Sequence, residues 1–177
     1  MECPACDNGR LLPGWLEPDL PAYRCTKCLG VLLQLISYRA WIEMSSQVEK
    51  SEDGELVSDD TAKALQCPRC DRLMVKYRFA TETSRRLDIC TRCEDVWMDD
   101  GEWEYLKHRC LHGELPKIFT EPWQRRLHRK IQAERTRDYW MQRLGEQAED
   151  AESVRQWLMA QPNKRDILLY LMDRDVD

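Results

Sequence analysis

The chain has 177 residues, of which 33% are charged and 42% hydrophobic, and its formal net charge is -5 at pH 7. This length fits one or two compact domains, and no apolar run approaches the roughly 18 residues of a membrane-spanning helix, so we expect no membrane partner. The acidic balance disfavours general nucleic-acid binding, which depends on neutralising phosphates, unless basic residues gather locally.

The cysteines are the most informative residues, because eight of the nine form four Cys-x-x-Cys pairs. The first residues, Met1-Glu2-Cys3-Pro4, have neither the basic start nor the apolar stretch of a secretory signal, so we expect a cytoplasmic protein. In that reducing compartment, paired cysteines are typical of thiolates bound to a metal and not of disulfides.

Residues 1–50 are predicted to form a first zinc ribbon with one helix. The pairs Cys3-Pro4-Ala5-Cys6 and Cys25-Thr26-Lys27-Cys28 flank the segment 7–24, which is long enough for two short strands that bring the second pair back over the first. The apolar run Val31-Leu32-Leu33 follows, and the pattern after it predicts a helix over 37–48 that carries a tryptophan.

Residues 51–65 are predicted to be an acidic linker. The stretch 43–60 carries seven carboxylates against one lysine, which is typical of a solvated connection. A helix continuing from 37 to 50 would overlap the first part of this stretch, so the boundary could shift by several residues.

Residues 66–115 repeat the organisation of the first ribbon. Cys67-Pro68-Arg69-Cys70 and Cys90-Thr91-Arg92-Cys93 flank the segment 71–89, which is almost the same length as its counterpart in the first copy. Val96-Trp97-Met98 matches the earlier apolar run, and a helix is predicted over 100–111.

Each copy supplies the four sulfur ligands that a structural zinc ion takes in tetrahedral geometry. We therefore expect two Zn(II) ions per chain, the first bound by Cys3, Cys6, Cys25 and Cys28 and the second by Cys67, Cys70, Cys90 and Cys93. A zinc ion with four thiolate ligands has no open coordination position, so it stabilises a fold and does not catalyse a reaction.

Three alternatives stay open at this point. One pair from each copy could surround each metal, although that arrangement closes a longer loop. An iron–sulfur cluster also takes four cysteines, and spacing alone does not exclude it. Disulfide redox chemistry would need a strand-to-helix context that is absent from this sequence.

The second copy resembles a known family. Cys67-Pro68-Arg69-Cys70 and the block Ile89-Cys90-Thr91-Arg92-Cys93-Glu94-Asp95-Val96-Trp97-Met98-Asp99-Asp100-Gly101-Glu102 are similar to the bacterial zinc-finger domain named for its similarity to the ribbon of transcription factor TFIIB. The resemblance is strong over 66–107 and weaker over 2–44. Glu94 and Asp95 replace two glycines of the family pattern, at a turn that favours positive φ, which Asp tolerates better than most residues. The resemblance implies zinc binding and a role near the transcription machinery, and it implies no activity.

The run Asp99-Asp100-Gly101-Glu102 is typical of a helix N-cap, with Glu102 near the positive end of the helix dipole. A catalytic carboxylate pair is the alternative, but no pocket or matched base is evident. Cys110 continues the apolar spacing of the preceding helix, so we expect it in the core. His108 and His112 are four residues apart, but without a third ligand they are expected to be solvated or to face a partner.

Residues 116–177 contain no cysteine and are predicted to be helical. A helix should start at Thr120-Glu121-Pro122 and stop at Gly145, a second should span 148–160, and a third should follow Asn163. Residues 117–143 carry a net charge of +5 in an acidic chain. The candidate partner-binding residues on this segment are Arg125, Arg129, Arg135 and Arg143.

Together these patterns predict a small α+β protein with two tandem zinc ribbons, each of short β-hairpins plus one helix, followed by a helical C-terminal region. We expect a non-enzymatic interaction module or adaptor that binds a protein partner and could self-associate through its amphipathic helices. The alternative is direct nucleic-acid binding through the basic helix 117–143 and the ribbon tips.

Overall fold

The protein is described here from a computed structural model, which covers residues 1–44 and 61–173. Most of the predicted acidic linker, and any continuation of the first predicted helix towards residue 50, lie outside the described residues. The chain divides into two compact units, Met1–His128 and Arg129–Asp177. Across the described ranges, no helix is both long enough and apolar enough to span a membrane.

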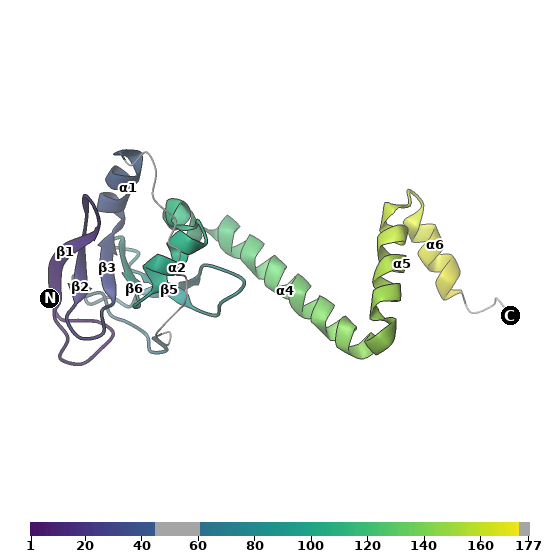
Figure 1. Ribbon diagram of the computed structural model, residues 1–177, viewed down its shortest axis with the longest axis horizontal. Helices are drawn as coiled ribbons and strands as arrows, with labels where there is room; N and C mark the ends of the chain where they lie inside the picture. The colour runs from purple at the N-terminus through teal and green to yellow at the C-terminus, as the bar shows by residue number, and fades with distance from the viewer. Residues whose placement is uncertain (45–60, 174–177) are drawn as a thin grey trace. The chain divides into compact units, whose positions relative to one another are not determined.

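The first unit is a small α+β structure built on one six-stranded antiparallel sheet, in the order β1-β2-β3-β6-β5-β4 (Figure 1). Three strands come from each copy of the repeat. These strands are β1 (Leu11–Glu17), β2 (Leu20–Cys25), β3 (Val31–Gln34), β4 (Val75–Arg78), β5 (Arg86–Ile89) and β6 (Asp95–Met98).

The two copies share this sheet because β3 and β6 pair antiparallel at its centre. Leu32 lies opposite Trp97, and these are the residues that the repeat equates, so a local two-fold axis passes between them. Both side chains are fully buried. Three strands alone leave two exposed edges, and pairing the copies removes one edge from each of them.

The helices cover one face of the sheet, and the cysteine turns cover the other. Because side chains alternate along a strand, Leu33 and Val96 join a core cluster with the helices, whereas Leu32 and Trp97 join a second cluster that contains the cysteines. The central strands are therefore buried on both faces, which explains why they read as continuous apolar runs.

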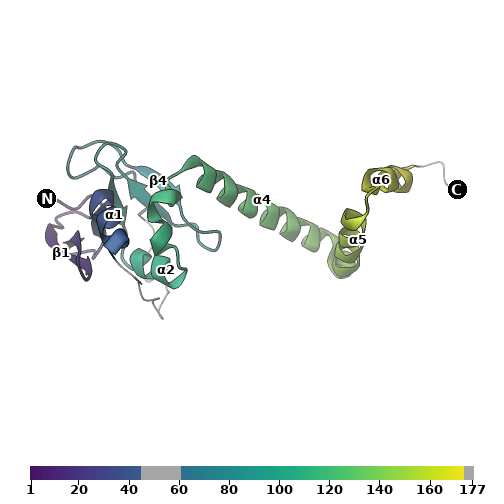
Figure 2. The same cartoon turned by 90° about the horizontal axis from the view of Figure 1, so that it is seen from above.

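Helices α1 (Leu35–Met44) and α2 (Glu102–His108) lie beside each other over one face of the sheet (Figures 1 and 2). The rings of Trp41 and Trp103, one from each helix, are 6.2 Å apart at their centroids. The short 3-10 helix η1 (His112–Glu114) and helix α3 (Leu115–Ile118) complete this layer. The predicted helix over 100–111 is shorter in the structure, since α2 ends at His108.

The expectation that Cys110 belongs to the core is wrong. The chain leaves the helical conformation after His108, and Cys110 adopts a left-handed backbone with φ 56°. Its side chain is exposed. The apolar face is instead continued by Leu115 and Ile118 of α3, both fully buried.

The predicted C-terminal helices are confirmed. Helix α4 (Glu121–Leu144) ends directly before Gly145, which has φ +57°, and α5 (Ala148–Ala160) follows the 3-10 helix η2 (Gly145–Gln147). Helix α6 (Lys164–Met172) begins after Asn163, although the Asn163 side chain makes no capping hydrogen bond. Within the first unit, Leu127 of α4 is buried and Trp123 packs against the core cluster that contains the helices.

Candidate metal centres

The strands position the cysteines as two pairs of facing turns. Cys25 is the last residue of β2, and Cys90 directly follows β5. Each turn is closed by a backbone hydrogen bond from its first cysteine N–H to a carbonyl beyond the pair. The four bonds run from Cys3 to Gly9 (2.9 Å), Cys25 to Gly30 (2.8 Å), Cys67 to Arg72 (2.8 Å) and Cys90 to Asp95 (2.9 Å).

Each turn also needs one residue in the left-handed region just after its second cysteine. These residues are Asn8 (φ 61°), Leu29 (φ 61°), Asp71 (φ 58°) and Glu94 (φ 54°). The positive φ expected where two family glycines are replaced therefore falls on Glu94, while Asp95 is the first residue of β6. Glu94 is supported by an ion pair with Arg39, 2.7 Å from Nη1 to Oε2.

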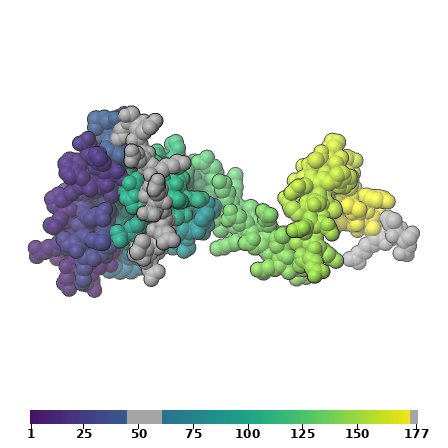
Figure 3. All heavy atoms as spheres, viewed as in Figure 1, coloured from purple at the N-terminus to yellow at the C-terminus, as the bar shows by residue number. Residues whose placement is uncertain are grey.

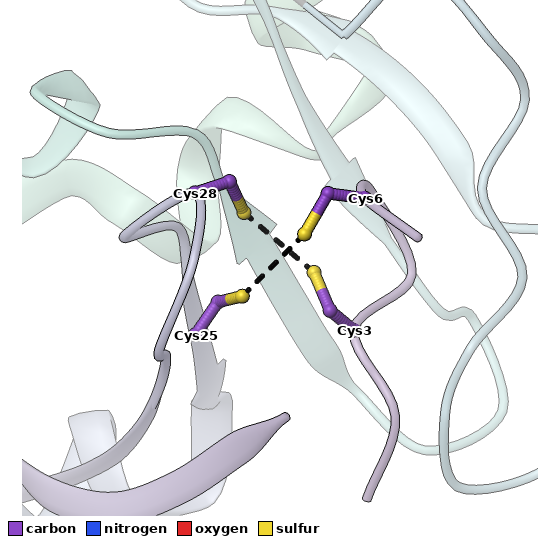
Figure 4. Close-up of side chains that lie close together, drawn as sticks. All are labelled: Cys3, Cys6, Cys25 and Cys28. Atoms are coloured by element: carbon purple, nitrogen blue, oxygen red, sulfur yellow. Dashed lines mark hydrogen bonds between the residues drawn. The ribbon is translucent and has the colours of Figure 1, made fainter. Parts of the chain in front are cut away.

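The four sulfur atoms of each copy converge on one point. Within each group, all four Sγ atoms lie within 4.8 Å of one another. In the first group, Cys3 and Cys28 are 3.6 Å apart and Cys6 and Cys25 are 3.7 Å apart (Figure 4). In the second group, Cys70 and Cys90 are 3.6 Å apart.

These separations fit a tetrahedral metal site. Four sulfurs at about 2.3 Å from a central ion stand about 3.8 Å from one another, whereas a disulfide brings two sulfurs to about 2.05 Å. Each group of four cysteines could therefore hold a metal ion, and four soft thiolates in this geometry suit Zn(II). The alternative with one pair from each copy around each ion is wrong, because each group is drawn from a single copy.

Backbone N–H groups in the turns lower the pKa of one thiol in each group. Burial raises the pKa of Cys25, but hydrogen bonds from the Cys28 and Lys27 N–H groups outweigh it and bring the pKa to about 7. The N–H of Arg72 lowers the pKa of Cys70 to about 7. Burial raises the pKa of Cys3 to about 11, so this thiol keeps its proton near neutral pH until a metal replaces it.

A buried carboxylate beside the second group was missed by the sequence analysis. Asp95 is fully buried, and its Oδ2 lies 3.9 Å from Cys67 Sγ and 2.8 Å from Arg69 Nε. Arg69 lies inside the Cys67-Pro68-Arg69-Cys70 turn, where its positive charge compensates the negative charges of the thiolates and of Asp95. The only signal in the sequence was an acidic residue in place of a glycine at the start of an apolar strand.

Asp99 has a different role from the one predicted. Its side chain does not cap α2, whose first turn has no side-chain capping bond. Asp99 instead accepts hydrogen bonds from the Trp97 indole N–H (2.9 Å) and from the Thr61 N–H and hydroxyl (both 2.7 Å). Glu102 Oε2 accepts from the Asp99 N–H at 2.9 Å. The acidic run therefore anchors Trp97 and the chain that follows the linker to the start of α2.

The histidines join neither group of ligands. Among the described residues, the clusters able to hold a metal contain cysteines alone. His108 is exposed, whereas His112 is partly buried against Trp103, with ring centroids 6.5 Å apart. Burial lowers the pKa of His112, and its carbonyl accepts a hydrogen bond from the Tyr38 hydroxyl.

The candidate partner-binding arginines are all exposed. Arg125, in the first unit, pairs with Glu121 on the same helix. Arg129, Arg135 and Arg143 belong to the second unit, and none of them forms an ion pair with another described residue. Their charges are available to a partner.

Comparisons with protein-family models, with curated proteins and with solved structures found no match to this chain. The fold and the sites themselves define the class, a small α+β protein with two four-cysteine groups compatible with zinc ribbons.

Proposed function

We propose that this chain is a zinc-stabilised, non-enzymatic interaction module that holds two Zn(II) ions. The two four-cysteine copies, within 1–44 and 66–115, form its rigid part, and the helical region 116–173 presents the binding surface. The convergence of the four sulfurs of each copy within 4.8 Å is the observation that carries the proposal. Zinc in such closed sites contributes folding energy to a domain too small for a large core.

The non-enzymatic part of the proposal is supported by the structural roles of the groups that could otherwise react, which are the thiolates and the carboxylates of Asp99 and Glu102. Four thiolates leave no coordination position for a substrate or water. Asp99 and Glu102, the only carboxylate pair that the sequence suggested for catalysis, are engaged with Trp97, Thr61 and the helix start. A general acid or base must be able to exchange a proton with a substrate. The hydrogen bonds of Asp99 and Glu102 instead hold parts of the fold together.

The partner is proposed to be a protein, and the resemblance of 66–107 to the TFIIB-type zinc-finger family points to the transcription machinery of the cytoplasm. The exposed apolar residues of α5 and α6 support a protein partner, because large apolar side chains in solvent are typical of interaction surfaces.

Metal analysis of the purified protein tests the zinc part. We expect two zinc ions per chain and no visible charge-transfer band. Iron at stoichiometric level together with such a band would show that the cysteines hold iron–sulfur clusters and not zinc.

The partner part is tested by purifying the tagged full chain from its native host and comparing it with a chain ending at His128, which keeps the buried Ile118 and Leu127. Transcription proteins recovered equally with both chains would contradict the proposed surface.

Direct nucleic-acid binding is a second candidate, favoured by the exposure of Arg129, Arg135 and Arg143. Phosphate binding should weaken steeply as salt rises from about 50 to 200 mM, and charge reversal at Arg135 should weaken it at every sequence. Charge reversal at Arg155, an exposed arginine of the acidic helix α5, is the matched control. An unchanged mobility of single-stranded and duplex probes at the low salt would exclude this function.

A further inference from the structure

The second unit exposes an unusual amount of apolar surface. In the described part of the chain, 19 large apolar side chains are exposed, and 11 of them lie in 139–172. Figure 3 shows α5 and α6 open to solvent on the face in view. The members of this apolar set are Tyr139, Trp140, Met141, Val154, Trp157, Met159, Leu168, Leu169, Tyr170, Leu171 and Met172.

Helix α6 is the clearest case, because none of its residues is buried. The run from Leu168 to Met172 is apolar at five consecutive positions, each at least 43% exposed, so it turns apolar side chains to every side of the helix. A helix that is apolar all round is stable in water only when other protein surrounds it. The second half of α6 therefore requires a covering surface that the described residues of its own unit do not supply.

A groove between α4 and α5 offers a surface into which a helix of a second molecule could pack. It has a volume of about 830 Å³ and is lined by the second half of α4 and the first half of α5. Trp140, Met141 and Leu144 are on one side of it, and Ala148 and Ala151 are on the other. Small residues facing large ones leave room for side chains of a second helix.

The charges of the same helices indicate which molecule covers them. Residues 129–144 contain five basic and two acidic side chains, a net charge of +3, whereas 145–160 contain four acidic and one basic, a net charge of -3. A two-fold arrangement of two identical chains places the basic segment of each against the acidic segment of the other, twice. The surface is thus complementary to itself.

We propose that 129–173 forms an interface with a second copy of this chain, so that the interaction module acts as a homodimer. The proposal rests on the proposed function and names one partner for its helical surface. The eleven large side chains, from 38% to 75% exposed, present on the order of 1,000 Å² in total. A stable interface buries roughly 800 Å² per partner, so it would need most of this apolar surface.

The test begins with the zinc-loaded full chain in sedimentation velocity at micromolar concentration. We expect twice the 21.1 kDa chain mass. The paired substitution Leu168→Glu and Leu171→Glu should raise the dimer dissociation constant by at least about tenfold. The matched control, Leu12→Glu and Leu73→Glu, changes two leucines of similar exposure in the first unit and should leave the dimer intact. Circular dichroism checks that α6 still folds.

A charge swap identifies the partner as a second copy. One variant carries Arg135→Glu and Arg143→Glu, and the other carries Glu146→Arg and Glu149→Arg. None of these four exposed residues forms an ion pair with another described residue, so each variant should fold as a monomer. Mixed in equal amounts, the two variants should form a dimer, since opposite charges then face each other at both contacts.

A wild-type monomer, a dimer insensitive to Leu168 and Leu171, or a failure of the mixed variants to associate would overturn the proposal. A monomer that binds lipid vesicles or a foreign protein through these residues would also overturn it, and would give the surface another occupant. The zinc content distinguishes failure of the dimer proposal from failure of the proposed function. A monomeric chain that holds two zinc ions would contradict the dimer and would still agree with a zinc-stabilised module.

Discussion

In the proposed zinc-bound protein, we expect the thiolates of Cys90 and its three partners to carry most of the stability of the second copy. Zinc binding to four sulfurs contributes about 10–16 kcal/mol in small zinc domains, which matches or exceeds the roughly 5–15 kcal/mol of net stability of an ordinary domain. No substitution in a core this small removes as much.

We expect Cys90→Ser to lower the zinc content from two ions per chain to one and to unfold the second ribbon at room temperature, because three thiolates cannot close the site. Metal analysis and thermal melting measure both effects. Cys110→Ser is the matched control, since Cys110 is exposed and belongs to neither group, and it should keep two ions. Unchanged zinc content in Cys90→Ser would contradict the ligand set.

His112 should make the stability depend on pH. Burial lowers its pKa below the ordinary 6.5, and nearby Lys107 lowers it further, while the Leu106 backbone and Glu17 act in the opposite direction. The unfolded chain therefore binds a proton that the folded chain does not, and the folded state loses stability as pH falls through about 6.5.

We expect the melting temperature of the zinc-saturated protein to fall between pH 7.5 and 6.0, with a smaller fall in His112→Gln. His108→Gln, which changes an exposed histidine, is the control and should follow the wild type. The same fall in melting temperature for all three proteins would show that His112 does not cause the pH dependence between pH 7.5 and 6.0.

The central strand pair depends on a close contact between β3 and β6. A Cβ added at Gly30 would lie 2.3 Å from the Trp97 ring, so the tryptophan of the second copy needs a glycine in the first. A small residue directly before β3 thus faces a large side chain on β6.

Gly30→Ala should destabilise the first unit by about 1–3 kcal/mol, because it overpacks a buried contact. Gly14→Ala in β1 meets no atom within 4 Å and should change stability little. Denaturant unfolding measures both. Combining Gly30→Ala with Trp97→Leu should cost less than the sum of the two single changes, and strict additivity would contradict the contact.

The helices show which sequence patterns are reliable. The boundaries of α4 and α5 were predicted closely, because Pro122 and Gly145 are strong local start and stop signals. The end of α2 was predicted too far along the chain, since the spacing of Leu106 and Cys110 is helical while the chain actually turns at Arg109 to bring Leu115 and Ile118 into the core. Tertiary packing overrode the local pattern there.

Removal of zinc should affect the two units differently. Trp41, Trp97 and Trp103 are buried in the first unit, whereas Trp140 and Trp157 in the second are about half exposed. A strong zinc chelator should shift the tryptophan emission to longer wavelength as the sheet unfolds, while the helical signal of 129–173, which contains no cysteine, remains.

Fluorescence and far-ultraviolet circular dichroism recorded on one chelated sample follow the two signals together. Added zinc should restore the emission. An emission spectrum that stays unchanged after the metal has been removed would mean that the sheet is stable without it.

The amino-acid sequence alone determined the four cysteine pairs, the internal repeat and the C-terminal helices, because these depend on short spacings and on residues that start or stop a helix. Only the tertiary structure decided that each sulfur group comes from one copy, that β3 and β6 join the two copies in one sheet, that Asp95 lies beside the second sulfur group, and that Cys110 is outside the core. Strand partners and burial depend on contacts between residues far apart in the chain, and no local pattern records them.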